Sequence, residues 1–352
     1  MPSTSWCARL ATLLPDDGAG AVLVVGPSWV GDMVMIEPLL ALLKERRPDR
    51  AIDVLAPAWS RPLLVRMAQV RRAIDLPIGH GALALGQRRR IGRALRGVYT
   101  EAIVLPGSWK SALVPFFAGI PRRTGFVREL RFGLLNDIRR LDKRALPMTV
   151  QRFWALGAAP GTPPPARLVP RLRSDAATVS ATLASLGVDA PSAPALVLCP
   201  GAEYGPAKRW PAEHFATVAR HYLGAGWRVW LVGSAKDAPV TAAIAALADG
   251  CVDLAGRTDL GQACDLIAAA DLVISNDSGL MHVAAAFGRP LVAVYGSSDP
   301  GFTPPLSERA RVLTLNLPCS PCFKRECPLG HLKCLNELSP GQVLDAAGAL
   351  RA

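Results

Sequence analysis

Asp32 is the acidic residue whose setting is best suited to acid–base chemistry. It closes the glycine-rich stretch GPSWVGD, residues 26–32, which follows a short apolar run. The stretch matches neither the dinucleotide fingerprint GxGxxG nor the phosphate loop GxxxxGK(S/T), because Asp32 stands where the phosphate loop has lysine. A glycine-rich turn lets a ligand approach the backbone, and a carboxylate there can serve as a general base. The alternative is that Asp32 caps a helix beginning near Met33, whose dipole would lower the carboxylate pKa unless burial compensated.

Lys208 is the basic side chain best placed to bind a phosphate. It lies in PGAEYGPAKRWP, residues 200–211, just before a helix that Pro211 predicts to begin nearby. The alternative is an ordinary solvated lysine beside Trp210 packed in the core. Because the stretch follows an apolar run that reads as a strand, we favour the phosphate-binding function.

The stretch NDSGLMHVAAA, residues 276–286, is typical of an anion site at a helix N-terminus. Its first three residues favour turns and helix caps, and Gly279 permits close approach of the backbone. Met281 and Val283 belong to the packed face of the expected helix. His282 could face either the core or a ligand, and a single histidine at such a position is more often structural.

These stretches follow apolar runs that recur along the chain, each succeeded by a longer helix-like segment. The alternation predicts an α/β fold with parallel sheets covered by helices, and such sheets bind ligands at the carboxyl ends of their strands. The predicted strands are AVLVVG (21–26), AIDVLA (51–56), AIVLPG (102–107), ALVLCPG (195–201), RVWLVGS (228–234), LVISNDS (272–278) and LVAVYGS (291–297).

The length of 352 residues is about twice that of a usual domain, so two domains are expected. The prolines of residues 158–173 forbid a regular helix and withhold donors from a sheet, which makes this segment the predicted linker. We therefore expect a leader over residues 1–20, one Rossmann-like domain over 21–157 and a second over 174–352. Two doubly wound sheets would then face a central cleft.

The positive charge of the chain is concentrated in its first half. Residues 1–173 hold 27 lysines and arginines against 12 aspartates and glutamates, whereas residues 174–352 hold 13 against 16. This favours an anionic partner, whether nucleic acid, an acidic membrane surface or a phosphorylated substrate. No apolar stretch is long enough to cross a membrane, and the N-terminus lacks the apolar core of a secretion signal. A soluble cytosolic protein is expected.

Four cysteines gather near the C-terminus in CSPCFKRECPLGHLKC, residues 319–334. Lasting disulfides are unusual in the cytosol, so Cys319, Cys322, Cys327 and Cys334 could hold a structural zinc ion or iron–sulfur cluster. Their spacing lacks the paired CxxC…CxxC form of common zinc ribbons. Four other cysteines are expected to be isolated small apolar residues: Cys7, Cys199, Cys251 and Cys264.

Taken together, the motifs resemble those of glycosyltransferase family 9, the lipopolysaccharide heptosyltransferases. The resemblance spans nearly the whole chain and is carried by GPSWVGDM, APAWSRPLL, LPGSWKSALVPFFAGIPRRTGF, PGAEYGPAKRWP, GSAKD and NDSGLMHVAAA. It implies a GT-B fold and transfer of L-glycero-D-manno-heptose, with inversion, from ADP-heptose to the heptose already on the Kdo–lipid A inner core. It implies no catalytic metal, and a cytoplasmic enzyme that associates peripherally with the inner leaflet of the inner membrane.

The resemblance also assigns roles to residues. Asp32 would deprotonate the acceptor hydroxyl, and Lys208 would hold the ADP phosphates. The donor's heptose and diphosphate would contact Asp277, Ser278, Gly279 and His282. Residues near the adenosine would be Glu203, Tyr204, Gly233, Ser234 and Asp237. The phosphates and carboxylates of the acceptor would dock on the basic half, with candidates Arg61, Lys110, Arg122 and Arg123. The alternative for these arginines is a generic solvated face, which also suits Arg88, Arg89 and Arg90.

Three other functions stay open. The first is a heptosyltransferase of neighbouring acceptor specificity. The second is a basic nucleic-acid-binding protein, which would need aromatic residues interleaved with the basic ones, whereas aromatics make up 6% of the chain and no nucleic-acid-binding module is evident. The third is a nucleotide-sugar epimerase, which would need a redox-cofactor fingerprint and a catalytic Tyr-x-x-x-Lys, a spacing that we do not expect the few tyrosines to provide.

Overall fold

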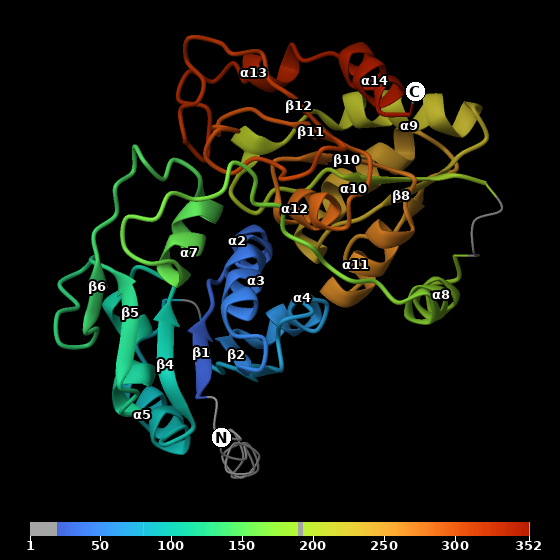
Figure 1. The fold of residues 1–352 in the computed structure, drawn as a ribbon. Coiled ribbons are helices and arrows are strands. Elements are labelled where there is room, and N and C mark those ends of the chain that lie inside the picture. Colours follow the sequence, from blue (N-terminus) through green and yellow to red (C-terminus); the bar gives the residue numbers. More distant parts are fainter. Residues whose placement is uncertain (1–19, 80, 189–192, 352) are drawn as a thin grey trace. The chain divides into compact units, whose positions relative to one another are not determined.

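A computed structural model describes residues 20–79, 81–188 and 193–351. The chain divides into two compact units, Met1–Leu168 and Val169–Ala352, and each unit contains its own sheet (Figure 1). The predicted leader lies outside the described residues except for Gly20, and so does Cys7. Residues 158–173, the predicted linker, form neither helix nor strand.

The first unit is built on a six-stranded parallel sheet in the order β3-β2-β1-β4-β5-β6. Its strands are β1 (Ala21–Val25), β2 (Ile52–Ala56), β3 (Arg72–Asp75), β4 (Tyr99–Val104), β5 (Arg122–Phe126) and β6 (Asp137–Arg139). Its helical segments are α2 (Val30–Met35), α3 (Glu37–Arg46), η1 (Ala58–Ser60), α4 (Arg61–Leu64), α5 (Leu85–Ala94), η2 (Trp109–Ala112), α6 (Leu113–Phe117) and α7 (Thr149–Gly157).

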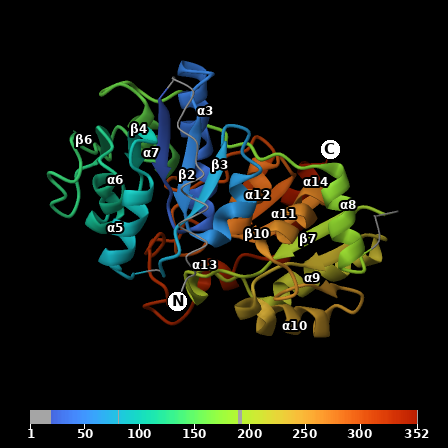
Figure 2. The same ribbon diagram turned by 90° about the horizontal axis from the view of Figure 1, so that it is seen from below.

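Strand β1 shows why the strands of this sheet appear in the sequence as unbroken apolar runs. Leu23 and Val25 belong to the buried cluster formed with α5 and α6, whereas the alternate residues Val22 and Val24 are buried outside that cluster. Figures 1 and 2 show α3 and α5 on opposite sides of the sheet. Because both faces are covered, polar residues do not alternate with apolar ones along the strand.

The second unit repeats this plan with the order β12-β11-β10-β7-β8-β9, again all parallel. Its strands are β7 (Ala195–Cys199), β8 (Arg228–Leu231), β9 (Val252–Asp253), β10 (Leu272–Asn276), β11 (Leu291–Val294) and β12 (Ala310–Leu313). Its helical segments are α8 (Ala176–Ser185), η3 (Pro206–Lys208), α9 (Ala212–Gly224), η4 (Ala235–Asp237), α10 (Ala238–Leu247), α11 (Leu260–Ala269), α12 (Gly279–Ala286), α13 (Lys333–Asn336) and α14 (Pro340–Ala349). Figure 2 shows α10 and α11 on opposite sides of β7.

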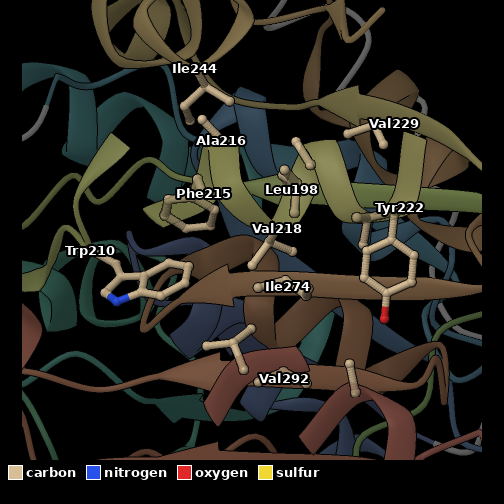
Figure 3. Close-up of a cluster of buried hydrophobic side chains, with 14 of the residues drawn as sticks. Leu198, Trp210, Phe215, Ala216, Val218, Tyr222, Val229, Ile244, Ile274 and Val292 are labelled. Atoms are coloured by element: carbon tan, nitrogen blue, oxygen red, sulfur yellow. The ribbon is translucent and has the colours of Figure 1, made fainter. Parts of the chain in front are cut away.

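The core on the α9 face of the second sheet includes Trp210, whose side chain is almost fully buried (Figure 3). Its ring lies 4.9 Å from that of Phe215, edge to face, and its indole N–H donates to the carbonyl of Leu338 at 2.8 Å. The aromatic pair adds packing energy beyond area burial, and the hydrogen bond satisfies the buried polar group. The prediction that Trp210 packs in the core is confirmed.

Both sheets confirm the predicted α/β class, and they share one strand order. Numbered within its own unit, each sheet runs 3-2-1-4-5-6, with the order reversing between β1 and β4 in the first and between β7 and β10 in the second. Loops leaving such neighbouring strands diverge and leave room for a ligand at their carboxyl ends. Asp32 follows β1, Lys208 follows β7 and Asp277 follows β10, so the sheets place three predicted site residues at reversal points.

Candidate active site

Asp32 lies in the first turn of α2, which begins at Val30 with Trp29 as the N-cap residue. The helix therefore starts earlier than Met33, and the alternative that Asp32 caps it is wrong. Burial raises the pKa of Asp32 to about 6, which is the compensation that a base at a helix N-terminus requires. A carboxyl group with a pKa near neutrality is well suited to accept a proton, so this environment is compatible with the predicted role of Asp32 as a base, which stays a prediction.

Lys208 forms a largely buried ion pair with Asp277. Its ammonium lies 2.5 Å from the Asp277 carboxylate, with side-chain exposures of 16% and 5%. The hydroxyl of Ser298, after β11, donates to the same carboxylate oxygen. The alternative of an ordinary solvated lysine is wrong, because the side chain is held in one place between loops that follow β7 and β10.

His282 lies on α12 and is 6% exposed. Burial lowers its pKa to about 4, and the positive charge of Lys208 lowers the pKa further while Asp277 opposes the shift. The imidazole is therefore neutral at neutral pH, with one N–H donor and one acceptor nitrogen. The charges of Asp277 and Lys208 both influence its pKa, so His282 is packed and lies within electrostatic range of the ion pair.

The start of α12 is arranged as the sequence predicts. Ser278 is the N-cap residue and Gly279 the first helical residue, and the Ser278 side chain makes no capping bond. The hydroxyls of Ser278 and Ser275 lie 3.2 Å apart. Asn276 is structural, because its amide donates to the carbonyl of Pro200 at 2.6 Å and accepts from the backbone N–H of Trp210. It ties the loop after β7 to the end of β10.

The turn after β8 contains Gly233, Ser234 and Asp237. The Asp237 carboxylate accepts from the Ser234 N–H at 2.9 Å and from its hydroxyl at 2.8 Å. A Cβ on Gly201 would come within 2.4 Å of that carboxylate, so the two loops pack closely. Asp237 thus shapes this turn by its own hydrogen bonds, and its predicted contact with adenosine stays a prediction.

Glu203 and Tyr204 lie on the loop between β7 and η3. Glu203 pairs with Lys236 at 2.6 Å, and both side chains are exposed. Tyr204 and Lys208 do have the Tyr-x-x-x-Lys spacing of nucleotide-sugar epimerases, so the expectation that no tyrosine provides it is wrong. The Tyr204 hydroxyl, however, donates to the carbonyl of Phe323 at 2.7 Å. Since its hydroxyl is engaged and the dinucleotide fingerprint is missing, the pair does not support the epimerase alternative.

The structure separates the four basic residues predicted to bind the acceptor. Arg61 on α4 pairs with Asp75, and Lys110 on η2 donates to the carbonyl of Gly81; both follow the carboxyl ends of strands. Arg122 and Arg123 instead open β5 and so lie toward its amino end, because the strand begins with them. These two do not join Asp32 at the carboxyl edge of the sheet.

Contacts within the first unit explain the arginines at the amino end of β5. Arg122 pairs with Asp137 at 2.8 Å, which links β5 to β6. The Arg123 guanidinium donates to the carbonyls of Ile120 and Leu134 at 2.6 and 2.7 Å. Arg88, unlike Arg122, is buried, and it donates to the carbonyl of Leu83, so its predicted place on a solvated face is wrong.

The cysteine-rich segment carries free thiols, of which Cys319 is exposed. Burial raises the pKa of Cys334, and Cys319, Cys327 and Cys322 raise it further. Among the residues that the structure describes, no three histidine, cysteine, aspartate or glutamate side chains are arranged to hold a metal ion. Three cysteines are separate from this segment, as predicted: Cys199 and Cys264 are buried, and Cys251 packs against the core of the second unit.

Two further residues that follow the carboxyl ends of strands were not predicted. Ser298 follows β11 in the motif VYGSSDP, so its place after a strand was a usable signal. Arg128 follows β5 and lies against Gly107, where a Cβ would come within 2.8 Å of its side chain. It is a cation at the carboxyl edge of the first sheet, in the place that Arg122 and Arg123 do not occupy.

No helix in the described parts of the chain combines the length and the apolar character that a bilayer crossing requires. This agrees with the sequence, in which charged and turn-forming residues interrupt each apolar stretch.

Comparison with known proteins identifies close relatives. The family model described as Glycosyltransferase family 9 (heptosyltransferase) matches residues 88–333. Lipopolysaccharide heptosyltransferase 2 of Escherichia coli K12 is 48% identical over 341 residues, which cover 94% of this chain and 98% of that protein. Lipooligosaccharide heptosyltransferase 2 of Haemophilus influenzae is 48% identical over 310 residues, covering 84% and 88% of the two chains.

A solved structure agrees over the same extent. The structure of Escherichia coli ADP-heptose LPS heptosyltransferase II is 46% identical, has a TM-score of 0.84 and covers 94% of this chain and 98% of its own. The two parallel sheets are thus those of a GT-B glycosyltransferase, as the motifs implied. The chain belongs to glycosyltransferase family 9, the heptosyltransferases.

Proposed function

We propose that this glycosyltransferase moves L-glycero-D-manno-heptose from ADP-heptose to the first heptose of the lipopolysaccharide inner core, heptosyl-Kdo2-lipid A. The observation that carries the proposal is the carboxylate of Asp32. It follows β1 at the point where the strand order of its sheet reverses, and burial raises its pKa to about 6. The names of the relatives, heptosyltransferase 2, support the choice of donor and acceptor.

In the proposed reaction Asp32 accepts the proton of the acceptor hydroxyl. The hydroxyl oxygen forms a bond to the anomeric carbon of the donor heptose on the face opposite ADP. The bond from that carbon to the diphosphate oxygen breaks, and ADP leaves with the electron pair. One attack from the opposite face inverts the configuration, so a single base suffices.

Lys208 supplies positive charge where the diphosphate leaves. Asp277 holds the ammonium in advance and is itself held by the hydroxyl of Ser298, so little reorganisation is needed as negative charge grows on the leaving group. The N–H groups at the start of α12, from Gly279 onward, provide further donors. His282, neutral because its pKa is about 4, can donate a hydrogen bond to the donor without adding charge.

The acceptor carries phosphates and carboxylates, which fit the excess of positive charge in residues 1–173. Arg61 and Lys110 are the predicted cations that follow strand ends, and Arg128 joins them in this proposal. A lipid-linked acceptor implies that the enzyme works at the cytoplasmic surface of the inner membrane, where these cations would also favour peripheral association.

A structural zinc ion or iron–sulfur cluster on Cys319, Cys322, Cys327 and Cys334 is a separate proposal. The mutual influence of the thiols on the pKa of Cys334 supports their proximity, but they would have to draw closer together than they lie here. Metal analysis of purified protein tests this directly, and a stoichiometric metal content that a Cys322→Ser variant loses would support it.

The function is tested by supplying ADP-heptose with acceptors that bear no heptose, one heptose or two. We expect ADP release and a heptose-extended product with the one-heptose acceptor. Transfer chiefly to either of the other acceptors would assign the neighbouring specificity instead. Absence of ADP-heptose turnover with all three would overturn the proposal.

A further inference from the structure

The cysteine-rich segment packs against the loop that carries Lys208. The carbonyl of Arg325 accepts a hydrogen bond from the N–H of Ala207 at 3.0 Å. A Cβ on Gly205 would lie 2.5 Å from that same carbonyl oxygen, so glycine is needed for the approach. The hydroxyl of Tyr204 donates to the carbonyl of Phe323 at 2.7 Å. The segment therefore touches the loop at three successive points.

The same segment also binds the loop that follows β11. The N–H of Phe323 donates to the carbonyl of Ser297 at 2.7 Å, and the hydroxyl of Ser320 donates to that of Gly296. The backbone N–H of Ser297 in turn donates to the carbonyl of Ala207 at 3.2 Å. Residues 320–325 thus bridge two loops whose members Lys208 and Ser298 both contact Asp277.

This docking brings a second cation to the ring of Tyr204, which Lys208 also contacts. The guanidinium carbon of Arg325 lies 5.2 Å from the centre of the Tyr204 ring, and the ammonium of Lys208 lies 5.1 Å from the same centre. Both distances are within cation–π range. The two cations differ in their partners: Lys208 has the carboxylate of Asp277, whereas in the described part of the chain Arg325 has no ion pair.

We propose that Arg325 is a second diphosphate-binding residue of the donor site, delivered by the cysteine-rich segment and held by the ring of Tyr204. This inference rests on the proposed function. Asp277 offsets much of the charge of Lys208, yet each phosphate of a nucleoside diphosphate sugar carries a negative charge. A guanidinium can bind phosphate oxygens in a bidentate manner and stack on an aromatic ring at the same time.

The position of Arg325 fits this role better than that of its neighbour. Lys324 is also exposed and also cationic, and it lies in the same segment, but no contact ties it to Tyr204. Lys324 therefore provides a matched control for any effect of net charge. The backbone carbonyl of Arg325, which holds Ala207, is kept in every side-chain variant, so the loop retains that hydrogen bond.

The test is calorimetric titration of full-length variants with ADP, followed by steady-state kinetics with ADP-heptose. We expect Arg325→Ala to raise the Kd for ADP about tenfold, the effect of losing one charge-assisted contact. The KM for ADP-heptose should rise similarly while kcat changes less than about twofold. Arg325→Lys should recover part of the affinity, and Lys324→Ala should match the wild type.

Variants at Tyr204 separate the ring from the hydroxyl. Tyr204→Phe keeps the aromatic ring that both cations contact, whereas Tyr204→Ala removes the ring. The Kd for ADP should therefore change less in Tyr204→Phe than in Tyr204→Ala. Raising the salt concentration should reduce the difference in the Kd for ADP between Arg325→Ala and the wild type, because salt screens an exposed charge contact.

Equal ADP affinity in Arg325→Ala and Lys324→Ala, with unchanged melting temperatures, would overturn the assignment of Arg325 and leave the proposed function intact. A wild-type enzyme that binds neither ADP nor ADP-heptose would instead overturn the proposed function.

Discussion

The ammonium of Lys208 lies 2.5 Å from the carboxylate of Asp277, between loops that follow the adjacent strands β7 and β10. Both side chains are largely buried, so each charge is stabilised by the opposite charge of its partner. Removing one partner of a buried pair leaves an uncompensated charge, whereas replacing both with neutral groups costs much less. The pair therefore links the stability of the second unit to its proposed capacity to bind a phosphate.

Lys208→Met should lower the free energy of unfolding by about 3 kcal/mol or more, because Asp277 is left buried without its cation. The double variant Lys208→Met with Asp277→Asn should recover much of that stability but not the affinity for ADP. Chemical denaturation and ADP titration of the three variants measure the two quantities separately. Equal destabilisation in the single and double variants would contradict the role of the unpaired charge.

Asp32→Asn should nearly abolish turnover while ADP binding is retained. Losing a general base typically lowers kcat by about 10²–10⁴-fold, and an amide cannot take its place. Asp32→Ala should behave in the same way. Activity assays and ADP titration on the same preparation provide the comparison, and turnover near the wild-type level would remove Asp32 from the mechanism.

Asp32→Asn should also make the protein more stable at neutral pH. Because the folded pKa of Asp32 is raised to about 6, the folded state binds the proton more tightly than the unfolded state. Stability due to this group is present at low pH and is lost as the pH rises through about 6. Asp32→Asn should thus raise the free energy of unfolding at pH 7.5, by at most about 3 kcal/mol, and the gain should vanish near pH 4. Thermal unfolding of both proteins at the two pH values measures the difference.

A plot of kcat/KM against pH should show a falling acidic limb that begins at a pH of about 6. Below that pH the Asp32 carboxylate becomes protonated, so kcat/KM should fall about tenfold per pH unit. His282 is not the source of this limb, because its pKa is about 4. A His282→Gln variant with residual activity should keep the limb at the same pH, and a shift of the limb in that variant would assign the titration elsewhere.

Gly205→Ala should weaken ADP binding without altering any side chain of the site. The new methyl group would meet the carbonyl of Arg325 at 2.5 Å, and backbone cannot yield as a flexible side chain can. We expect a several-fold rise in the Kd for ADP and a loss of about 1–3 kcal/mol in stability. Gly224→Ala is the control, since a Cβ there meets nothing within 4 Å.

The sequence was a reliable guide to the strands at the centre of each sheet. Strands such as β1 and β10 are covered on both faces, so they appear as unbroken apolar runs. It gave no signal for β3, β5 and β6 of the first sheet, which begin with Arg72, Arg122 and Asp137, or for β9 and β12 of the second sheet. These strands lie toward the edges of their sheets, where side chains are partly exposed and polar residues are tolerated. Arg122 and Arg123, predicted as acceptor-binding residues, begin one of these strands.

Residues of the candidate site could be predicted where a polar side chain directly follows a strand. They could not be predicted where their role depends on contacts between residues far apart in the sequence. Asp32, Lys208 and Asp277 each stand after a recognisable strand. The hydrogen bond between Tyr204 and Phe323 joins residues 119 positions apart, and no local pattern encodes it. The pKa of Asp32 is likewise set by burial, which depends on packing that the sequence does not display.

The bridge between the cysteine-rich segment and the Lys208 loop has a consequence for biosynthesis. The strands of both sheets lie within residues 21–313, whereas Phe323 and Arg325 come later in the chain. Domains fold in the order in which they leave the ribosome, so both sheets can close before these residues are released. The nascent enzyme would then acquire its full contacts with the nucleotide only after both sheets are complete, at the stage when α13 and α14 add Leu335 and Val343 to the core of the second unit.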